Sequence, residues 1–187
     1  MRRAFIVFTL VSSIVVVIDQ LTKWLAESKL FAGDPFSLTG FLNLTLVYNR
    51  GAAFGFLNDQ SGWQVALFSI IAIAVIGYMI YHIRSEVHSN GLVIFAYGMI
   101  AGGAVGNLID RLAYGYVIDF IDFYIREWHF WIFNMADSAL TVGVVLLFAA
   151  SFFESRTSVS TLGAKEQSTR NAASESPGQS SEDTNHL

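Results

Sequence analysis

Two aspartates, Asp119 and Asp137, lie among segments of this chain that are otherwise apolar enough for a lipid bilayer. A carboxylate at membrane depth is costly, and it therefore marks a functional site by default. Two carboxylates close together cannot both ionise easily, so the pair would carry a single proton near neutral pH. One could then draw a proton from water while the other donates a hydrogen bond to a scissile carbonyl. Such a pair needs no metal, no cofactor and no nucleophilic side chain.

The residues around Asp119 leave two candidates open. The sequence VIDFIDF at residues 117–123 carries Asp119 and Asp122 three positions apart. On an extended strand their side chains point to opposite faces, so at most one of them faces a given site. The default interpretation of either is a solvated loop carboxylate, which we expect to hold for Asp122. Asp137 is different, because it is expected to lie roughly two helical turns inside the apolar segment that starts at Trp128, where a solvated carboxylate is a poor explanation.

A third polar stretch, GGAVGNLIDR at residues 102–111, interrupts another apolar run. Spacings of three and four place several of its residues on one helical face. These residues are Gly103, Asn107, Asp110 and Arg111. Gly102 and Gly106 form a small-xxx-small pair, and helix packing alone is an equally good interpretation of these glycines. For Asp110 and Arg111, the simplest interpretation is a local ion pair at the helix end.

The elements that must position these groups belong to a membrane protein. Of the 187 residues, 53% are hydrophobic and only 14% are charged, and the mean hydropathy is +0.50. These values are too apolar for an ordinary soluble domain. Half of the net charge of −4 comes from the C-terminal tail, and the sequence has no basic patch, which argues against nucleic acid as a partner. Zero cysteines exclude disulfides and cysteine-based metal or catalytic sites.

The pattern predicts an integral membrane, mainly α fold with transmembrane helices at about residues 4–25, 63–83, 91–109 and 128–153. Arg2 and Arg3 precede the first span without a cleavage site after it, which predicts an uncleaved helix and cytoplasmic termini. Segments 31–57 and 112–127 predict a small extracytoplasmic β-cradle with a short interfacial helix. Residues 154–187 have the composition of a disordered cytoplasmic tail, which leaves residues 1–153 as the membrane domain.

Five blocks in this order resemble bacterial lipoprotein signal peptidase, also called signal peptidase II. They are IDQLTK (residues 18–23), NRGAAF (49–54), GGAVGNLIDR (102–111), VIDFIDF (117–123) and FNMAD (133–137). The resemblance covers roughly residues 4–153 and implies an intramembrane aspartic endopeptidase of the bacterial cytoplasmic (inner) membrane. It implies cleavage of diacylglyceryl-modified prolipoproteins just before the lipidated cysteine, at an active site toward the extracytoplasmic side.

The resemblance also assigns roles to individual residues. Asp119 and Asp137 match the family's catalytic pair. The other polar or glycine residues at motif positions are Asp19, Lys23, Asn49, Gly51, Gly103, Asn107, Asp110, Arg111 and Asn134. Among these, the three asparagines and Arg111 are implied to position the substrate or brace the aspartates. Asp19 and Lys23 are implied to structure the end of the first helix, and Asp110 with Arg111 to support the site.

One rival hypothesis is a small transporter or proton relay that uses Asp119 and Asp137. The lack of evident inverted repeats argues against it. A membrane scaffold, in which the aspartates only tie helices together, is a third interpretation. For the peptidase we expect prolipoprotein substrates, contact with membrane lipid and a monomeric chain.

Overall fold

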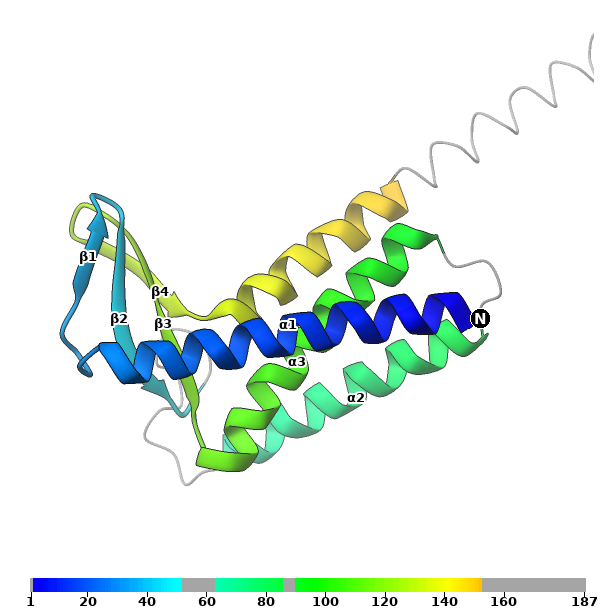
Figure 1. Cartoon of the computed structure of the whole chain (residues 1–187), viewed down its shortest axis with the longest axis horizontal. Coiled ribbons are helices and arrows are strands. Elements are labelled where there is room, and N and C mark those ends of the chain that lie inside the picture. The colour runs from blue at the N-terminus through cyan, green and yellow to red at the C-terminus, as the bar shows by residue number, and fades with distance from the viewer. Residues whose placement is uncertain (1, 52–62, 86–89, 153–187) are drawn as a thin grey trace, which may run out of the picture. The chain divides into compact units, whose positions relative to one another are not determined.

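The computed structural model describes residues 2–51, 63–85 and 90–152. Its helices are α1 (Arg2–Lys29), α2 (Trp63–Ser85), α3 (Gly91–Tyr114) and a fourth helix, Met135–Phe152. All four are long and apolar enough to cross a membrane, which confirms the expected fold class. The strands β1 (Phe36–Thr39), β2 (Leu42–Asn49), β3 (Val117–Ile125) and β4 (Trp128–Phe133) form one antiparallel sheet in that order. The sheet lies at one end of the helices (Figure 1).

Helix α3 is the central helix of the bundle. Of its most apolar stretch 61% is buried, against 17%, 17% and 22% for the other three helices. A Cβ atom built on Gly102 would lie 2.6 Å from Cβ of Val15, so only glycine lets α1 approach this closely. On the other side, a Cβ on Gly143 of the fourth helix would lie 2.6 Å from Cγ1 of Ile100. Glycines therefore bring α3 into close contact with α1 and with the fourth helix.

Helix α3 is longer than expected. It continues past residue 109 to Tyr114 and ends at Gly115, whose φ of 76° is the left-handed conformation that glycine adopts readily. The backbone N–H of Gly115 donates to the carbonyl of Arg111 and closes the last turn. Asp110 and Arg111 consequently lie within the helix near its last turn, although the predicted span ends at residue 109.

The fourth helix begins later than the predicted span of 128–153. Residues Trp128–Phe133 form strand β4, which pairs with β3, and the helix begins at Met135. The physical reason is composition, because the run WHFWIF is aromatic and β-branched and so fits a pleated edge strand. Asp137 therefore lies in the first helical turn and not two turns inside an apolar span.

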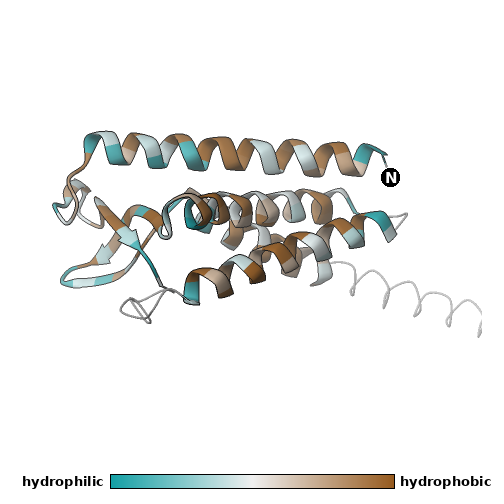
Figure 2. Ribbon diagram, turned by 90° about the horizontal axis from the view of Figure 1, so that it is seen from below, coloured by the Kyte–Doolittle hydropathy of each residue, from teal (hydrophilic) through white to brown (hydrophobic). Residues whose placement is uncertain are grey.

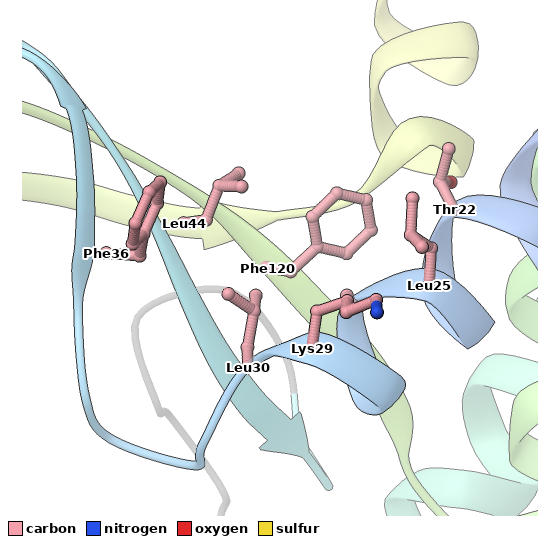
Figure 3. Close-up of a pocket in the computed structure, with 8 residues that line it drawn as sticks. Thr22, Leu25, Lys29, Leu30, Phe36, Leu44 and Phe120 are labelled. Atoms are coloured by element: carbon pink, nitrogen blue, oxygen red, sulfur yellow. The ribbon is translucent and has the colours of Figure 1, made fainter.

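The sheet packs against the end of α1 through a small apolar core of Ala26, Leu46, Ile118 and Phe120. Apolar colouring dominates the helices and is mixed with polar residues in the sheet (Figure 2). Beside this core lies a pocket of about 350 Å³ whose walls are almost entirely apolar (Figure 3). Phe120 points into this pocket, whereas Asp119, its neighbour in sequence, does not line it. The expected interfacial helix near residues 52–57 and the tail from residue 154 lie outside the described residues.

Candidate active site

Asp119 and Asp137 are brought together by a shared asparagine. Asp119 lies on β3 with 2% of its surface exposed, and Asp137 is half-buried in the first turn of the fourth helix. The side-chain Nδ2 of Asn134 donates to Oδ1 of Asp119 at 2.7 Å. The backbone N–H of Asn134 donates to Oδ2 of Asp137 at 3.3 Å. One residue thus fixes both carboxylates.

Asn134 also starts the helix that carries Asp137. Its Oδ1 accepts the backbone N–H of Asp137 at 3.0 Å, while Asp137 accepts the backbone N–H of Asn134 in return. This reciprocal pair is a capping box, which satisfies donors that a helix start would leave unpaired. An Asn-x-x-Asp spacing ahead of an apolar run is a helix-start signal in the sequence. That signal, overlooked in the predicted span of 128–153, explains the start at Met135.

Two further asparagines complete the contacts of the pair. Asn49 of β2 donates through Nδ2 to Oδ2 of Asp119 at 2.9 Å, and its own Oδ1 accepts the N–H of Gly51 at 3.0 Å. Asn107 of α3 donates through Nδ2 to Oδ1 of Asp137 at 2.8 Å. All four carboxylate oxygens therefore accept a hydrogen bond from a neutral amide. Among the residues that the structure describes, these bonds orient the carboxylates without placing a cation at hydrogen-bond distance of them.

The electrostatic balance at Asp119 favours its protonated form. Burial raises the pKa of Asp119 to about 7, and the nearby charge of Asp137 acts in the same direction. The hydrogen bonds from Asn49 and Asn134 favour the ionised form, but they do not offset the burial. Asp119 therefore exchanges its proton near neutral pH. This is the behaviour expected of one member of a proton-sharing pair.

A buried ionic cluster lies beside the pair. Nζ of Lys23 donates to Oδ2 of Asp19 at 2.8 Å and to Oδ1 of Asn107 at 3.0 Å, and it lies 2.8 Å from Oδ2 of Asp110. The expected local pair between Asp110 and Arg111 is therefore wrong, since Asp110 pairs with Lys23 of α1. Consecutive helical residues do not face the same neighbour, which is the physical reason.

The remaining predicted residues occupy the edges of the site. Nη1 of Arg111 donates to the carbonyl of Asn107 at 3.3 Å, and its guanidinium carbon lies 5.1 Å from the ring centre of Phe68 on α2. Gly103 packs against the fourth helix, where an added Cβ would lie 2.9 Å from Cγ of Leu140. Arg111 thus ties α2 to α3, and Gly103 allows the fourth helix to approach.

Asp122 is not the solvated loop carboxylate that we expected. It is 2% exposed, and Oγ1 of Thr45 donates to its Oδ2 at 3.3 Å. Its Oδ1 lies 2.8 Å from Nδ1 of His129 on β4. Because strands β2 and β4 flank β3 on both sides, neighbouring side chains shield Asp122 from water. Its partners differ from those of Asp119.

Within residues 2–51, 63–85 and 90–152, no cluster of three or more histidine, aspartate or glutamate side chains could hold a metal ion. The arrangement instead offers a half-buried carboxylate, Asp137, beside a fully buried one, Asp119, that titrates near neutral pH. A pair of this kind can activate a water molecule and polarise a carbonyl group.

Known proteins resemble this chain over most of its length. A family model described as signal peptidase (SPase) II matches residues 11–153. The lipoprotein signal peptidase of Coxiella burnetii (strain RSA 493 / Nine Mile phase I) is 47% identical over 136 residues, which are 73% of this chain and 83% of that protein. The lipoprotein signal peptidase of Burkholderia cenocepacia (strain HI2424) is 50% identical over 138 residues, or 73% and 82% of the two chains.

Solved structures resemble it as well. A bacterial membrane enzyme determined by the in meso method at 2.3 Å resolution superposes with a TM-score of 0.71 at 38% identity. The match covers 79% of this chain and 88% of that one. A second bacterial membrane enzyme, at 1.9 Å resolution, gives a TM-score of 0.69 at 36% identity over 76% and 90% of the chains.

Proposed function

The chain belongs to the signal peptidase II family, and from this premise we propose that Asp119 and Asp137 are the carboxylates with which it removes signal peptides from prolipoproteins. Its substrates are prolipoproteins that already carry a diacylglyceryl group on a cysteine, and it cleaves just before that cysteine. The enzyme is an aspartic endopeptidase of the bacterial inner membrane.

One observation carries this proposal, namely the double contact of Asn134. Its side chain bonds Asp119 on β3 and its backbone bonds Asp137 on the fourth helix, so two carboxylates from separate elements are oriented together. A carboxylate pair that only tied helices together would be expected to contact each other's backbone or a cation. Here the close partners of both are neutral amides, which leaves the shared proton of the pair available for chemistry.

The environments of the two aspartates suggest different roles. Asp119 is buried and has a pKa raised to about 7, so it holds the shared proton when the enzyme is active. Asp137 is half-buried, which leaves it more accessible to an incoming water molecule. Asp137 is therefore the general base, and Asp119 is the general acid.

Proton transfers between these groups account for hydrolysis. Asp137 takes a proton from water as the water oxygen bonds to the scissile carbonyl carbon, and Asp119 gives its proton to the carbonyl oxygen. The resulting gem-diol collapses, the C–N bond breaks, and the leaving nitrogen takes the proton from Asp137. A hydroxyl proton returns to Asp119, so the pair ends the cycle with one proton, as it began.

The other family positions act around this centre. Asn49, Asn107 and Asn134 hold the carboxylates or the substrate backbone, and Gly51 supports Asn49 through its N–H. Arg111 braces α3 against α2. The catalytic unit comprises residues 1–153, acts as a monomer in contact with membrane lipid, and does not need residues 154–187. Truncation after residue 153 should leave cleavage unchanged, and a loss of cleavage would contradict this boundary.

Four spans with Arg2 and Arg3 ahead of the first favour cytoplasmic termini and an extracytoplasmic sheet. Because the chain has no cysteine, single cysteines can report the topology. In intact spheroplasts, an impermeant thiol reagent should label Thr39→Cys but not Arg2→Cys. The opposite pattern would reverse the orientation.

The decisive experiment supplies purified protein in detergent with a diacylglyceryl-modified prolipoprotein and measures the released signal peptide. Wild type should cleave this substrate, while Asp119→Asn and Asp137→Asn should not, although both fold. The same prolipoprotein without its lipid should remain uncut. Cleavage by either variant would refute the pair, and cleavage of the unlipidated protein would refute the substrate class. Proton flux in proteoliposomes that depends on Asp137, without cleavage, would support the transporter hypothesis instead.

A further inference from the structure

We infer that Lys23 and Gln20 of α1 are positioning residues for catalysis, because they join two buried aspartates that each hold the backbone next to one catalytic carboxylate. The inference rests on the proposed catalytic roles of Asp119 and Asp137. It goes beyond those roles, because it assigns the control of the distance between the carboxylates of Asp119 and Asp137 to α1. Helix α1 itself carries neither of these two aspartates.

The two supporting aspartates make equivalent contacts. Oδ1 of Asp19 accepts the backbone N–H of Ala136 at 2.9 Å, and Ala136 directly precedes Asp137. Oδ2 of Asp110 accepts the backbone N–H of Ile118 at 3.2 Å, and Ile118 directly precedes Asp119. Each catalytic residue is therefore tethered through the N–H of the residue before it.

The two tethers are joined by groups from α1. Nζ of Lys23 lies 2.8 Å from Oδ2 of both Asp19 and Asp110. Nε2 of Gln20 donates to Oδ1 of Asp110 at 2.9 Å and to Oδ2 of Asp19 at 3.3 Å. The charged side chain of Lys23 and the neutral side chain of Gln20 thus both connect Asp19 with Asp110.

The charged part of the bridge is buried, and its neutral part, Gln20, is half-buried. Asp19 and Asp110 are 0% exposed and Lys23 is 1% exposed, so water cannot replace their mutual contacts. Gln20 also donates to the carbonyl of Gly106 at 3.3 Å, and a Cβ on Gly106 would lie 3.0 Å from Cγ of Asp19. A polar network in which each member is satisfied is rigid at low local dielectric. The segments that carry Asp119 and Asp137 are accordingly held to one rigid support.

A positioning role differs from simple helix packing in what it changes. If the bridge loosens, the catalytic carboxylates should separate, and a misplacement of about 1 Å can cost about 10²-fold in rate. Separation also weakens the influence of Asp137 on the proton of Asp119. Both effects alter turnover and its pH dependence, whereas substrate binding should change little.

The test replaces Gln20 with leucine, which removes the neutral bridge without changing any charge. Relative to wild type, Gln20→Leu should lower kcat by about ten-fold while KM stays within about two-fold. The alkaline fall of kcat should shift to lower pH, because the charge of Asp137 then raises the pKa of Asp119 less. Lys23→Gln removes the contacts of Nζ with Asp19 and Asp110 and, in addition, a buried positive charge. Folded Lys23→Gln should therefore have a lower kcat than Gln20→Leu.

Ser12→Ala is the matched control. Oγ of Ser12 donates to the carbonyl of Gly98 at 3.1 Å, so this substitution removes one hydrogen bond between the same two helices, about two turns from the bridge. It should leave kcat and the pH profile unchanged. Wild-type kcat and pH profile in Gln20→Leu, or equal losses in Ser12→Ala, would overturn the inference. Asp119→Asn is assayed in parallel, since its activity alone decides whether the catalytic pair itself is assigned correctly.

Discussion

Asp119 and Asp122 lie three residues apart on one strand and are equally buried at 2% exposure, yet their surroundings differ. Asp119 accepts hydrogen bonds from two neutral amides and lies near a second carboxylate. Asp122 accepts one from the hydroxyl of Thr45 and lies against the imidazole of His129. Burial alone therefore does not distinguish Asp119, which we propose to be catalytic, from Asp122. The partners do, because an imidazole can compensate a carboxylate charge, whereas a second carboxylate opposes it.

The largest expected effect separates these two residues directly. Asp119→Asn should lower kcat by at least about 10³-fold, because an amide can neither carry nor return the shared proton. Asp122→Asn, the same chemical change on the same strand, should retain at least about a third of wild-type kcat, since its carboxylate does not take part in proton transfer. The measurement is release of the signal peptide from a lipidated prolipoprotein, normalised to folded protein.

Equal inactivity of both variants, with both folded, would contradict the distinction between the two environments. Retained cleavage by Asp119→Asn would show that Asp119 does not take part in the reaction. Circular dichroism in detergent, measured on the same samples, shows whether a loss of cleavage arises from unfolding.

The next effect concerns the residue that unites the catalytic pair. Asn134→Ala should lower kcat by about 10²-fold, because Asp119 loses the donor Nδ2 and the first helical turn, which carries Asp137, loses its cap, so the separation of the two carboxylates can change. It should also weaken the start of the fourth helix, for which loss of a cap costs about 1 kcal/mol. Cleavage kinetics and thermal unfolding measure the two consequences separately.

Asn90→Ala provides the comparison for Asn134→Ala. Asn90 caps α3 through Oδ1, which accepts the N–H of Leu92 at 3.0 Å, at the end of that helix opposite Asp110 and Arg111. Its replacement should cost similar stability while leaving kcat near that of wild type. Equal losses of kcat in the two variants would mean that capping alone explains Asn134.

Ordered polar blocks between apolar runs point to a site, because polar groups are rare in membrane segments. The residues alone leave Asp119 and Asp122 as alternatives, and only the family resemblance selects Asp119. The catalytic roles of Asp119 and Asp137 stay a prediction. The start of the fourth helix was misplaced, since the aromatic run at Trp128–Phe133 is as apolar as a span, and only pairing with β3 makes it a strand.

Partners across the fold were harder to predict than the residues themselves. Adjacency in the sequence predicts that Asp110 pairs with Arg111, but its partner Lys23 lies on another helix. Asp122 was interpreted as solvated because its partners Thr45 and His129 come from the two flanking strands. Spacing along one element predicts a shared face, but which neighbour covers that face depends on tertiary packing.

A smaller effect should appear in the pH dependence of the two aspartates. With a pKa of about 7, Asp119 is protonated below neutral pH and ionised above it. Because the reaction needs its proton, kcat should fall about ten-fold per pH unit above this value. In stability, the protonated Asp119 favours the folded state. That contribution is fully present below the ordinary value of 3.8 and is lost as the pH rises through about 7.

Infrared spectroscopy of protein labelled with ¹³C-aspartate can follow this proton without turnover. A carboxylic acid band should disappear with a midpoint near pH 7, and it should be absent from Asp119→Asn but present in Asp122→Asn. A midpoint near pH 4 would mean that the hydrogen bonds donated by Asn49 and Asn134 lower the pKa of Asp119 as much as burial raises it. The alkaline fall of kcat would then need another source.

The smallest expected effect on activity tests the structural side of the comparison. Asp122→Asn keeps the shape of the side chain but weakens its contact with His129, so it should destabilise the sheet by about 0.5–1.5 kcal/mol. Thr45→Val, which removes the other partner, should cost a similar amount, and the double variant should cost less than the sum because both act on one carboxylate. Thermal unfolding of the three variants measures this coupling. Strict additivity would show that the hydroxyl of Thr45 and the carboxylate of Asp122 do not stabilise the sheet through their mutual contact.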